Sequence, residues 1–360
     1  MSTEFRAASH SRFRSIPSVE SILAVLIVLV AAWLASTYEF RTAPYSDLTG
    51  RLFDQHLRVV QGEAGNPTQF RPLPEWIWDL LIRVQTVRGS GDPIYTSLLV
   101  LRYTQNLLLF TLAYCYYRVL GLHIFAALLG IAMLSIIGAA SVSLNWLRLS
   151  SNLDVSFYLL AGILILRRHD IWIIPLAMLA SLNREGSGFI PFMLLTARIP
   201  ELMRASTRTR TLTIVGLAIV GWFSMYVAMR VLYPPQALVT DLFDAAIQLN
   251  LRRETSWMNI FGTFGVLPLV ALLGLRTWPH LLRIWFWLIV PLWIVVHVLA
   301  SLINETVLFF EPTALLLIPG SIFAAMHVAS PERVQRTQRE PVPVDQDQPL
   351  DPVFVEAPRR

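Results

Sequence analysis

The chain contains no lysine, and all 29 of its basic residues are arginine. GC-rich codon usage explains this better than selection for phosphate binding, because the arginines do not gather in the single basic face that nucleic acid requires. We therefore expect no nucleic-acid partner. Cysteine is almost absent as well, since Cys115, within an apolar run, is the only one. A lone cysteine excludes an intrachain disulfide and does not favour thiol chemistry.

Charge of either sign is scarce. Only 15% of the 360 residues are charged, 55% are hydrophobic, and the mean hydropathy is +0.55. This is more apolar surface than a soluble core can bury, so the composition predicts an all-α polytopic membrane protein. The stretch 20 to 36 could pass for a signal peptide, but further apolar segments follow it in place of a soluble domain, and we interpret it as a retained first helix. Walker, dinucleotide, HExxH and G-x-S-x-G motifs are missing.

Seven stretches are compatible with a span of about 20 residues: 20 to 36, 96 to 119, 122 to 143, 210 to 233, 259 to 275, 284 to 303 and 306 to 327. A shorter apolar run covers 153 to 166. If 171 to 199 were one more span, Arg198 and the arginines after it would lie opposite Arg167 and Arg168, against the positive-inside rule. We therefore predict two short helices, 171 to 182 and 187 to 199, that meet at a glycine-containing turn.

This segmentation predicts about 9 to 10 transmembrane or half-length helices, with the N-terminus and C-terminus in the cytoplasm. Residues 1–19 form a cytoplasmic segment, 20–327 the transmembrane domain, and 328–360 a disordered cytoplasmic tail rich in Pro, Gln, Asp and Arg. The extracytoplasmic loop 37–95 is too long for a mere connector. Its FRPLPEWIWDLLIRV piece predicts an interfacial helix anchored by Trp76 and Trp78, either as a plain surface helix or as one that shapes a substrate site.

Three polar residues, Asn183, Arg184 and Glu185, interrupt the apolar sequence between the two short helices. A charged side chain in hydrocarbon costs ~2.5–3.5 kcal/mol on insertion scales, so such residues usually face a bundle interior or a wet cavity. The triplet therefore indicates a site. The alternative is an ion pair between Arg184 and Glu185 that only fixes helix packing, although a buried pair gains little over apolar packing.

Other candidates lie on the same predicted face. Asp47 could be a general base in the outer loop, or a solvated loop residue. If that piece is helical, Asp54 would share its helical face, either as a partner or merely as a surface residue. Arg71 offers a guanidinium that can bind two phosphate oxygens, unless it contacts only lipid headgroups or nothing. Asp154 begins a helix, where N-terminal capping would also explain it.

Three further polar residues flank the last apolar segment: Asn304, Glu305 and Glu311. Glu311 lies about two turns inside that segment and needs a partner, because an unpaired buried charge is costly.

These features together resemble a known family: an apolar first helix, an outer loop with an early Asp and a later Phe-Arg-Pro-Leu, and Leu-Asn-Arg-Glu splitting a hydrophobic hairpin. The pattern, over residues 20 to 327, is similar to bacterial members of the GT-C glycosyltransferase superfamily that resemble polyprenyl-phosphate-sugar-dependent mannosyl- and arabinosyltransferases. The resemblance implies a GT-C-like fold in a bacterial cytoplasmic membrane. It also implies a polyprenyl-phosphate-linked sugar as donor and inverting transfer to a glycan, lipid or protein acceptor at the extracytoplasmic face.

Under this resemblance Asp47 takes the position of the base, and Arg71 and Arg184 neutralise the donor phosphate. The remaining candidates for substrate binding are Asp154, Asn183, Glu185, Asn304 and Glu305. The chain departs from the family because Asp47 has no adjacent acidic residue and Gly186 stands where the motif usually continues with Thr. A divalent cation such as Mg or Mn is compatible with this chemistry, but the departures leave the base and any metal open.

Two other classes of function stay open. A transporter or flippase for a lipid-linked or anionic solute would also use broken helices with polar tips, and it should show inverted halves of matched length. A non-catalytic assembly protein would keep the fold without the base.

Overall fold

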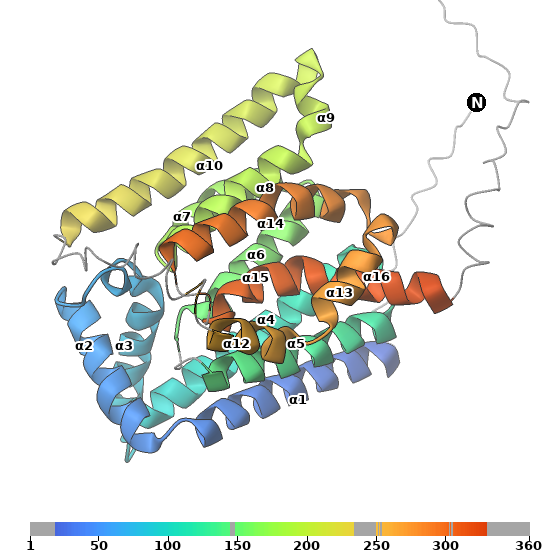
Figure 1. The fold of residues 1–360 in the computed structure, drawn as a ribbon. Helices are drawn as coiled ribbons and strands as arrows, with labels where there is room; N and C mark the ends of the chain where they lie inside the picture. The colour runs from blue at the N-terminus through green and yellow to red at the C-terminus, as the bar shows by residue number, and fades with distance from the viewer. Residues whose placement is uncertain are drawn as a thin grey trace, which may run out of the picture.

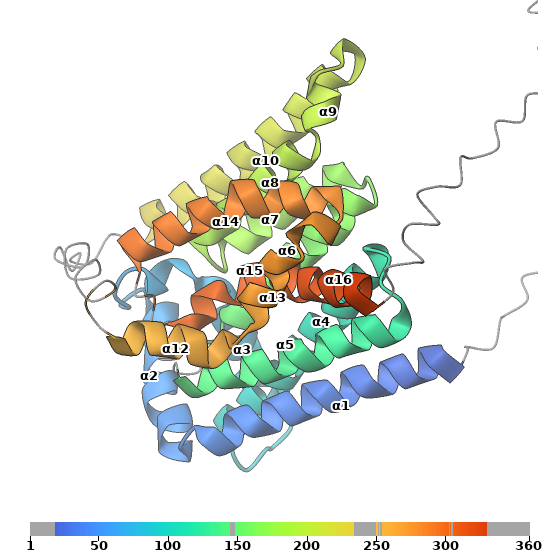
Figure 2. The ribbon, with the colours of Figure 1, turned by 45° about the vertical axis from the view of Figure 1, so that its right-hand side comes forward.

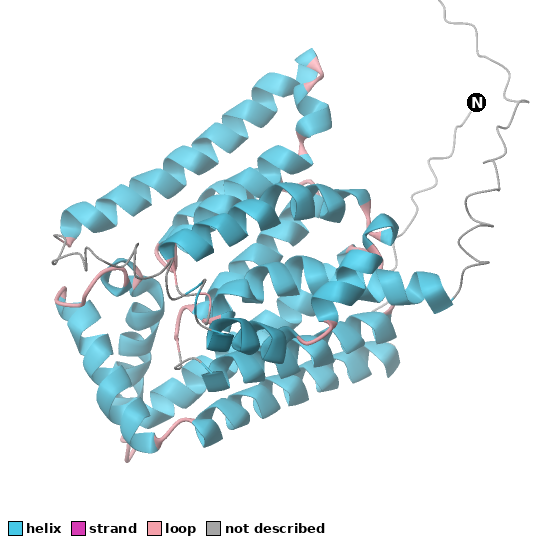
Figure 3. Ribbon diagram, viewed as in Figure 1, coloured by secondary structure: helices cyan, strands magenta, loops and turns pink. Residues whose placement is uncertain are grey.

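The computed structural model describes residues 19–144, 148–233, 250, 252, 254–301, 303 and 305–329. Every regular element in these ranges is helical (Figures 1 and 3). The α-helices are α1 (Val19–Thr42), α2 (Leu52–Gln61), α3 (Pro72–Val87), α4 (Pro93–Val119), α5 (Ile124–Leu144), α6 (Ser151–Leu166), α7 (Ile173–Ser181), α8 (Phe189–Ala197), α9 (Ile199–Leu202), α10 (Ala205–Leu232), α12 (Glu254–Phe264), α13 (Leu267–Leu273), α14 (His280–Ala300), α15 (Phe310–Pro312) and α16 (Ile318–Ala329). The 3₁₀ turns are η2 (Thr68–Phe70), η3 (Asp170–Trp172), η4 (Glu185–Gly188), η5 (Leu275–Thr277) and η6 (Thr306–Phe309), and η1 (Asp47–Arg51) and η7 (Thr313–Leu317) are π-helical.

Six helices of the described chain are long and apolar enough to cross a membrane: Val19–Thr42, Pro93–Val119, Ile124–Ser141, Ala205–Leu232, His280–Leu299 and Thr306–Val328. Large apolar side chains such as Trp33 on α1 and Phe223 on α10 are exposed on the protein. A soluble protein would not expose so many of them together, and acyl chains would cover them. The chain is therefore an all-α, multi-pass membrane protein. Most of the predicted terminal segments 1–19 and 328–360 lies outside the described residues.

The two short helices predicted between 171 and 199 are confirmed as α7 and α8, each nine residues long. Arg198, at the end of α8, forms an ion pair of 2.6 Å with Asp170, which precedes α7. Arg198 also donates to the carbonyl oxygen of Ile165 at the end of α6. Since the start of α7 and the end of α8 meet in this way, the two helices form a hairpin whose tip is the 183–188 turn.

The span predicted over 259 to 275 is not one continuous helix but a bent pair, which together is long and apolar enough for a broken span or a re-entrant loop. The chain bends there by 69° between α12 and α13. Gly265 follows α12 with a φ of +52°, a left-handed conformation that suits glycine and ends a helix. Pro268 lies in the first turn of α13, where the missing N–H costs nothing.

The first loop also differs from the prediction at both of its landmarks. Helix α1 continues to Thr42 rather than ending at residue 36, because Glu39 is buried and pairs with Arg102 of α4 at 2.7 Å. The structure has a helix at the predicted place, α3, and Trp76 on it is 42% exposed. Trp78, predicted as a second anchor, is instead fully buried, and its indole N–H donates to Ser97 of α4.

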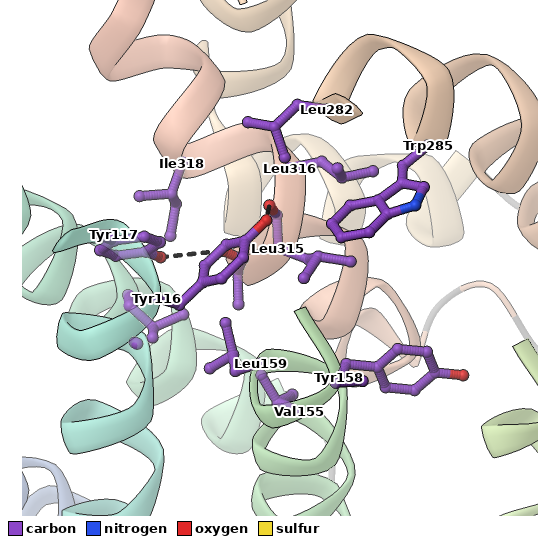
Figure 4. Close-up of a cluster of buried hydrophobic side chains, with 14 of the residues drawn as sticks. Tyr116, Tyr117, Val155, Tyr158, Leu159, Leu282, Trp285, Leu315, Leu316 and Ile318 are labelled. Carbon is purple, nitrogen blue, oxygen red and sulfur yellow. Dashed lines mark hydrogen bonds between the residues drawn. The ribbon is translucent and has the colours of Figure 1, made fainter. Parts of the chain in front are cut away.

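The last span, Thr306–Val328, lies at the centre of the bundle and is its most buried apolar helix. Figure 4 shows Tyr116 and Tyr117 of α4 beside this span, and their hydroxyl groups donate at 3.0 Å to the carbonyl oxygens of Leu315 and Ala314. Both carbonyls belong to η7. Buried backbone oxygens need donors, so the two tyrosines satisfy the irregular turn and fix α4 to the central span.

Helices α2 and α3 stand at one end of the bundle, across the direction of α1, as Figures 1 and 2 show. We refer to this end as the site end. The C-terminal ends of α1, α10 and α14 and the tip of the α7–α8 hairpin all reach it.

Candidate functional site

A cavity of about 960 Å³ opens at the site end. Segments far apart in the sequence form its walls, from the end of α1 to the start of the last span. Its charged lining consists of five arginines and four carboxylates: Arg51, Arg71, Arg148, Arg184, Arg230, Asp47, Glu75, Glu185 and Glu305. A cavity of this volume can hold a small-molecule ligand.

Asp47 enters this cavity from the first residue of η1 and is half-buried. No side chain in the described part of the protein forms a hydrogen bond or ion pair with its carboxylate. Asp54 lies exposed on α2 and does not line the cavity, so of its two readings, a partner of Asp47 or a surface residue, the structure favours the surface residue. Among the described residues Asp47 is therefore a half-buried carboxylate that no side chain binds.

Arg184 does not pair with Glu185, which corrects one reading of the triplet. Its Nη1 atom lies 3.3 Å from Asp154 of α6 and 3.0 Å from Glu311 of α15. All three side chains are almost completely buried behind the cavity wall, and only Arg184 lines the cavity itself. Glu311 thus has the partner that its depth requires. Asp154 makes no side-chain cap of α6; it neutralises an arginine instead.

Glu185 points to other arginines. Its Oε2 atom accepts from both Nε and Nη2 of Arg71, at 3.1 and 2.9 Å. Its Oε1 atom lies 3.7 Å from Arg230. The guanidinium of Arg230 stacks on Tyr226 at 3.5 Å and on Phe70 at 4.3 Å from the ring centroids.

Asn183 is fully buried and does not line the cavity. Its side-chain amide donates at 3.0 Å to the carbonyl oxygen of Ser150. The residue therefore ties the hairpin tip to the start of α6 and acts on the site through position alone.

Glu305 lines the cavity and forms an ion pair of 2.6 Å with Arg148. Burial lowers the pKa of the Arg148 guanidinium from its usual range; Glu305 opposes this, and the nearby Arg184 and Arg71 lower it further. Arg148 therefore has two other positively charged side chains, Arg184 and Arg71, in its surroundings. Asn304, the other predicted residue here, lies outside the described residues.

Sequence reasoning missed Arg148 and Arg230. Arg148 lies in a short link between two apolar helices, held where Arg102 and Gln105 of α4 donate to the carbonyl oxygens of Arg148 and Leu149. Arg230 lies in the last turn of α10, where an arginine normally extends toward the lipid headgroups. Only its aromatic neighbour four residues earlier, Tyr226, could have indicated a fixed position.

Within the described ranges, no group of three or more His, Cys, Asp and Glu side chains is arranged to hold a metal ion. Comparison with known proteins finds no matching family model, no matching curated protein and no matching solved structure. The geometry of the cavity is therefore what indicates a function.

Proposed function

We propose that this protein is a membrane glycosyltransferase that transfers a sugar from a polyprenyl-phosphate donor to an acceptor at the extracytoplasmic face. The observation that supports the proposal best is the shared cavity: Asp47, whose carboxylate is bound by no side chain of the described residues, lines it together with five arginines. A transfer of this kind needs a base at the acceptor hydroxyl and positive charge at the leaving phosphate.

The position of the cavity suits a lipid-linked donor. A polyprenyl phosphate must keep its tail among acyl chains while its headgroup meets an aqueous acceptor. The cavity lies at the site end, close to the partly exposed helix α3, and apolar side chains such as Phe189 and Trp293 line it beside the charged ones. A headgroup could therefore enter from the level of the interface.

In this mechanism the Asp47 carboxylate accepts the proton of the acceptor hydroxyl as that oxygen attacks the anomeric carbon of the donor. The bond from that carbon to the phosphate oxygen breaks, and the phosphate leaves with the electron pair. Arginine side chains fixed in the cavity offset the charge that grows on the phosphate, which is how preorganised donors lower such a barrier. Asp47 acts as the base because a carboxylate within hydrogen-bond reach can take the proton.

The test is Asp47→Asn, assayed for transfer from a polyprenyl-phosphate-linked sugar in membranes. Loss of a general base typically lowers the rate by about 10²–10⁴-fold, and we expect the rate of sugar transfer to fall by a factor of this size. Asp54→Asn is the matched control, since Asp54 is an exposed aspartate outside the cavity, and it should keep full activity. Full activity of the Asp47 variant would contradict the assignment and leave Glu305 as the carboxylate to test next.

A further inference from the structure

Glu185 holds an unusual position between two cavity arginines. Arg71 directs two nitrogen donors at a single carboxylate oxygen, Oε2. The other oxygen, Oε1, accepts no hydrogen bond from the described residues, although Arg230 lies 3.7 Å away. One carboxylate oxygen of Glu185 therefore has two donors and the other has none. The two arginines are thus poorly satisfied by a carboxylate, and an anion with more oxygens could use more of their donors.

The Arg230 guanidinium is held by groups other than Glu185. It lies over the rings of Tyr226 and Phe70 and donates to the carbonyl oxygen of Tyr226, and a stacked guanidinium presents its donors in a fixed plane. Arg71 directly follows Phe70 at the start of α3, so the two arginines meet at this ring. Removal of Glu185 would thus leave the donors of Arg71 and Arg230 without the carboxylate that lies between them.

Glu185 can be reached from the cavity that it lines. It begins the η4 turn. The side chains of the three residues are partly accessible, at 17% for Arg71, 22% for Glu185 and 30% for Arg230. By contrast Arg184 and its partners Asp154 and Glu311 are almost completely buried, so a ligand in the cavity cannot reach the carboxylates that Arg184 binds.

We infer that Arg71 and Arg230 form a binding site for a phosphate group, and that the Glu185 carboxylate occupies this site until a ligand displaces it. A phosphate offers three or more oxygens in the geometry that arginine donors bind in pairs. The inference deepens the proposed function, because the phosphate of the donor would bind here. It reassigns phosphate binding from Arg184 to Arg230.

The experiment measures binding of inorganic pyrophosphate to the purified full chain in detergent, by calorimetry at constant ionic strength. A competing group weakens apparent affinity by the fraction of molecules in which the site is free, so Glu185→Gln should bind more tightly than the wild type, by about tenfold for a site that is free in one tenth of the wild-type molecules. Arg71→Gln and Arg230→Gln should lose binding. Arg83→Gln is the control, because Arg83 is an exposed arginine of α3 that pairs with Asp79 outside the cavity, and its binding should not change.

A second series uses a short-chain polyprenyl phosphate in the same detergent. Tighter binding of Glu185→Gln to both ligands supports a site for the phosphate group itself, and tighter binding to the lipid alone supports a site for a lipid headgroup. Unchanged or weaker binding of both ligands to Glu185→Gln, with its helical circular dichroism intact, would overturn the inference. Sugar transfer is a separate readout: if transfer is absent while the binding pattern holds, the transferase proposal fails and the phosphate site stands.

Discussion

Arg184 and Arg230 line the same cavity but differ in what their removal would expose. Arg184 is the counter-ion of two buried carboxylates, Asp154 and Glu311, and each of these has a second oxygen without a hydrogen bond in the described chain. Arg230 is partly accessible, and its nearest carboxylate is Glu185 at 3.7 Å. Residue type alone does not distinguish the two arginines; the depth of their partners does.

Arg184→Leu should therefore destabilise the protein far more than Arg230→Leu. Removing one partner of a buried ion pair costs roughly 3–5 kcal/mol, because an uncompensated charge stays behind. A partly exposed pair contributes about 0–1 kcal/mol. Denaturant unfolding of both variants in the same detergent provides the comparison. Equal, small losses of unfolding free energy would mean that Asp154 and Glu311 do not depend on Arg184 for neutralisation.

At the scale of elements, the pattern of charges predicted more than the pattern of hydrophobic residues did. The arginines around 167 and 198 to 210 required two short helices, and the structure has α7 and α8 joined at their base by the Arg198–Asp170 pair. Apolar length alone joined α12 and α13 into one span, although Gly265 and Pro268 are ordinary signals for the end and the start of a helix. Hydropathy is averaged over a window of residues, so a single glycine or proline hardly changes it and it cannot locate a bend.

The bend brings α13 against α16 at very close range. A side chain added at Gly274, at the end of α13, would place its Cβ 2.0 Å from the Cβ and 2.9 Å from the Cα of Ala324. Gly274→Ala should therefore force the helices apart and lower the free energy of unfolding by about 1–3 kcal/mol.

Gly262→Ala is the matched control on α12, since no atom lies within 4 Å of a Cβ at that glycine. Alanine in an open helical position is neutral or gains about 0.4–1 kcal/mol. Thermal unfolding of the two variants measures the difference. If both alanines are tolerated equally, α13 and α16 do not pack as closely as described.

At the scale of the whole molecule, the cavity brings together charged residues from Asp47 to Glu305. The sequence indicated those that interrupt apolar runs or follow a recognisable motif, such as Arg71, Arg184 and Glu185. It could not assign partners, because the pairs Arg71–Glu185 and Arg184–Glu311 join positions more than a hundred residues apart. Nor could it find Arg148 and Arg230, whose positions in the cavity follow from helix packing alone.

The orientation of the bundle in the membrane is the last prediction. Thr86 on α3 is exposed at the site end. His169, just before α7, and Ser206, at the start of α10, are exposed at the end of the bundle away from the cavity. In a Cys115→Ser background, single cysteines at His169 and Ser206 should react with a membrane-impermeant thiol reagent only after the cytoplasmic face is opened. A cysteine at Thr86 should react in intact cells, because the arginine-rich end of the bundle stays inside.

If the cysteines at 169 and 206 reacted from opposite faces, the chain between them would cross the membrane once and the hairpin would be wrong. If all three faces were reversed, the hairpin would stand but the cavity would open to the cytoplasm, and the acceptor of the proposed transfer would have to be sought there.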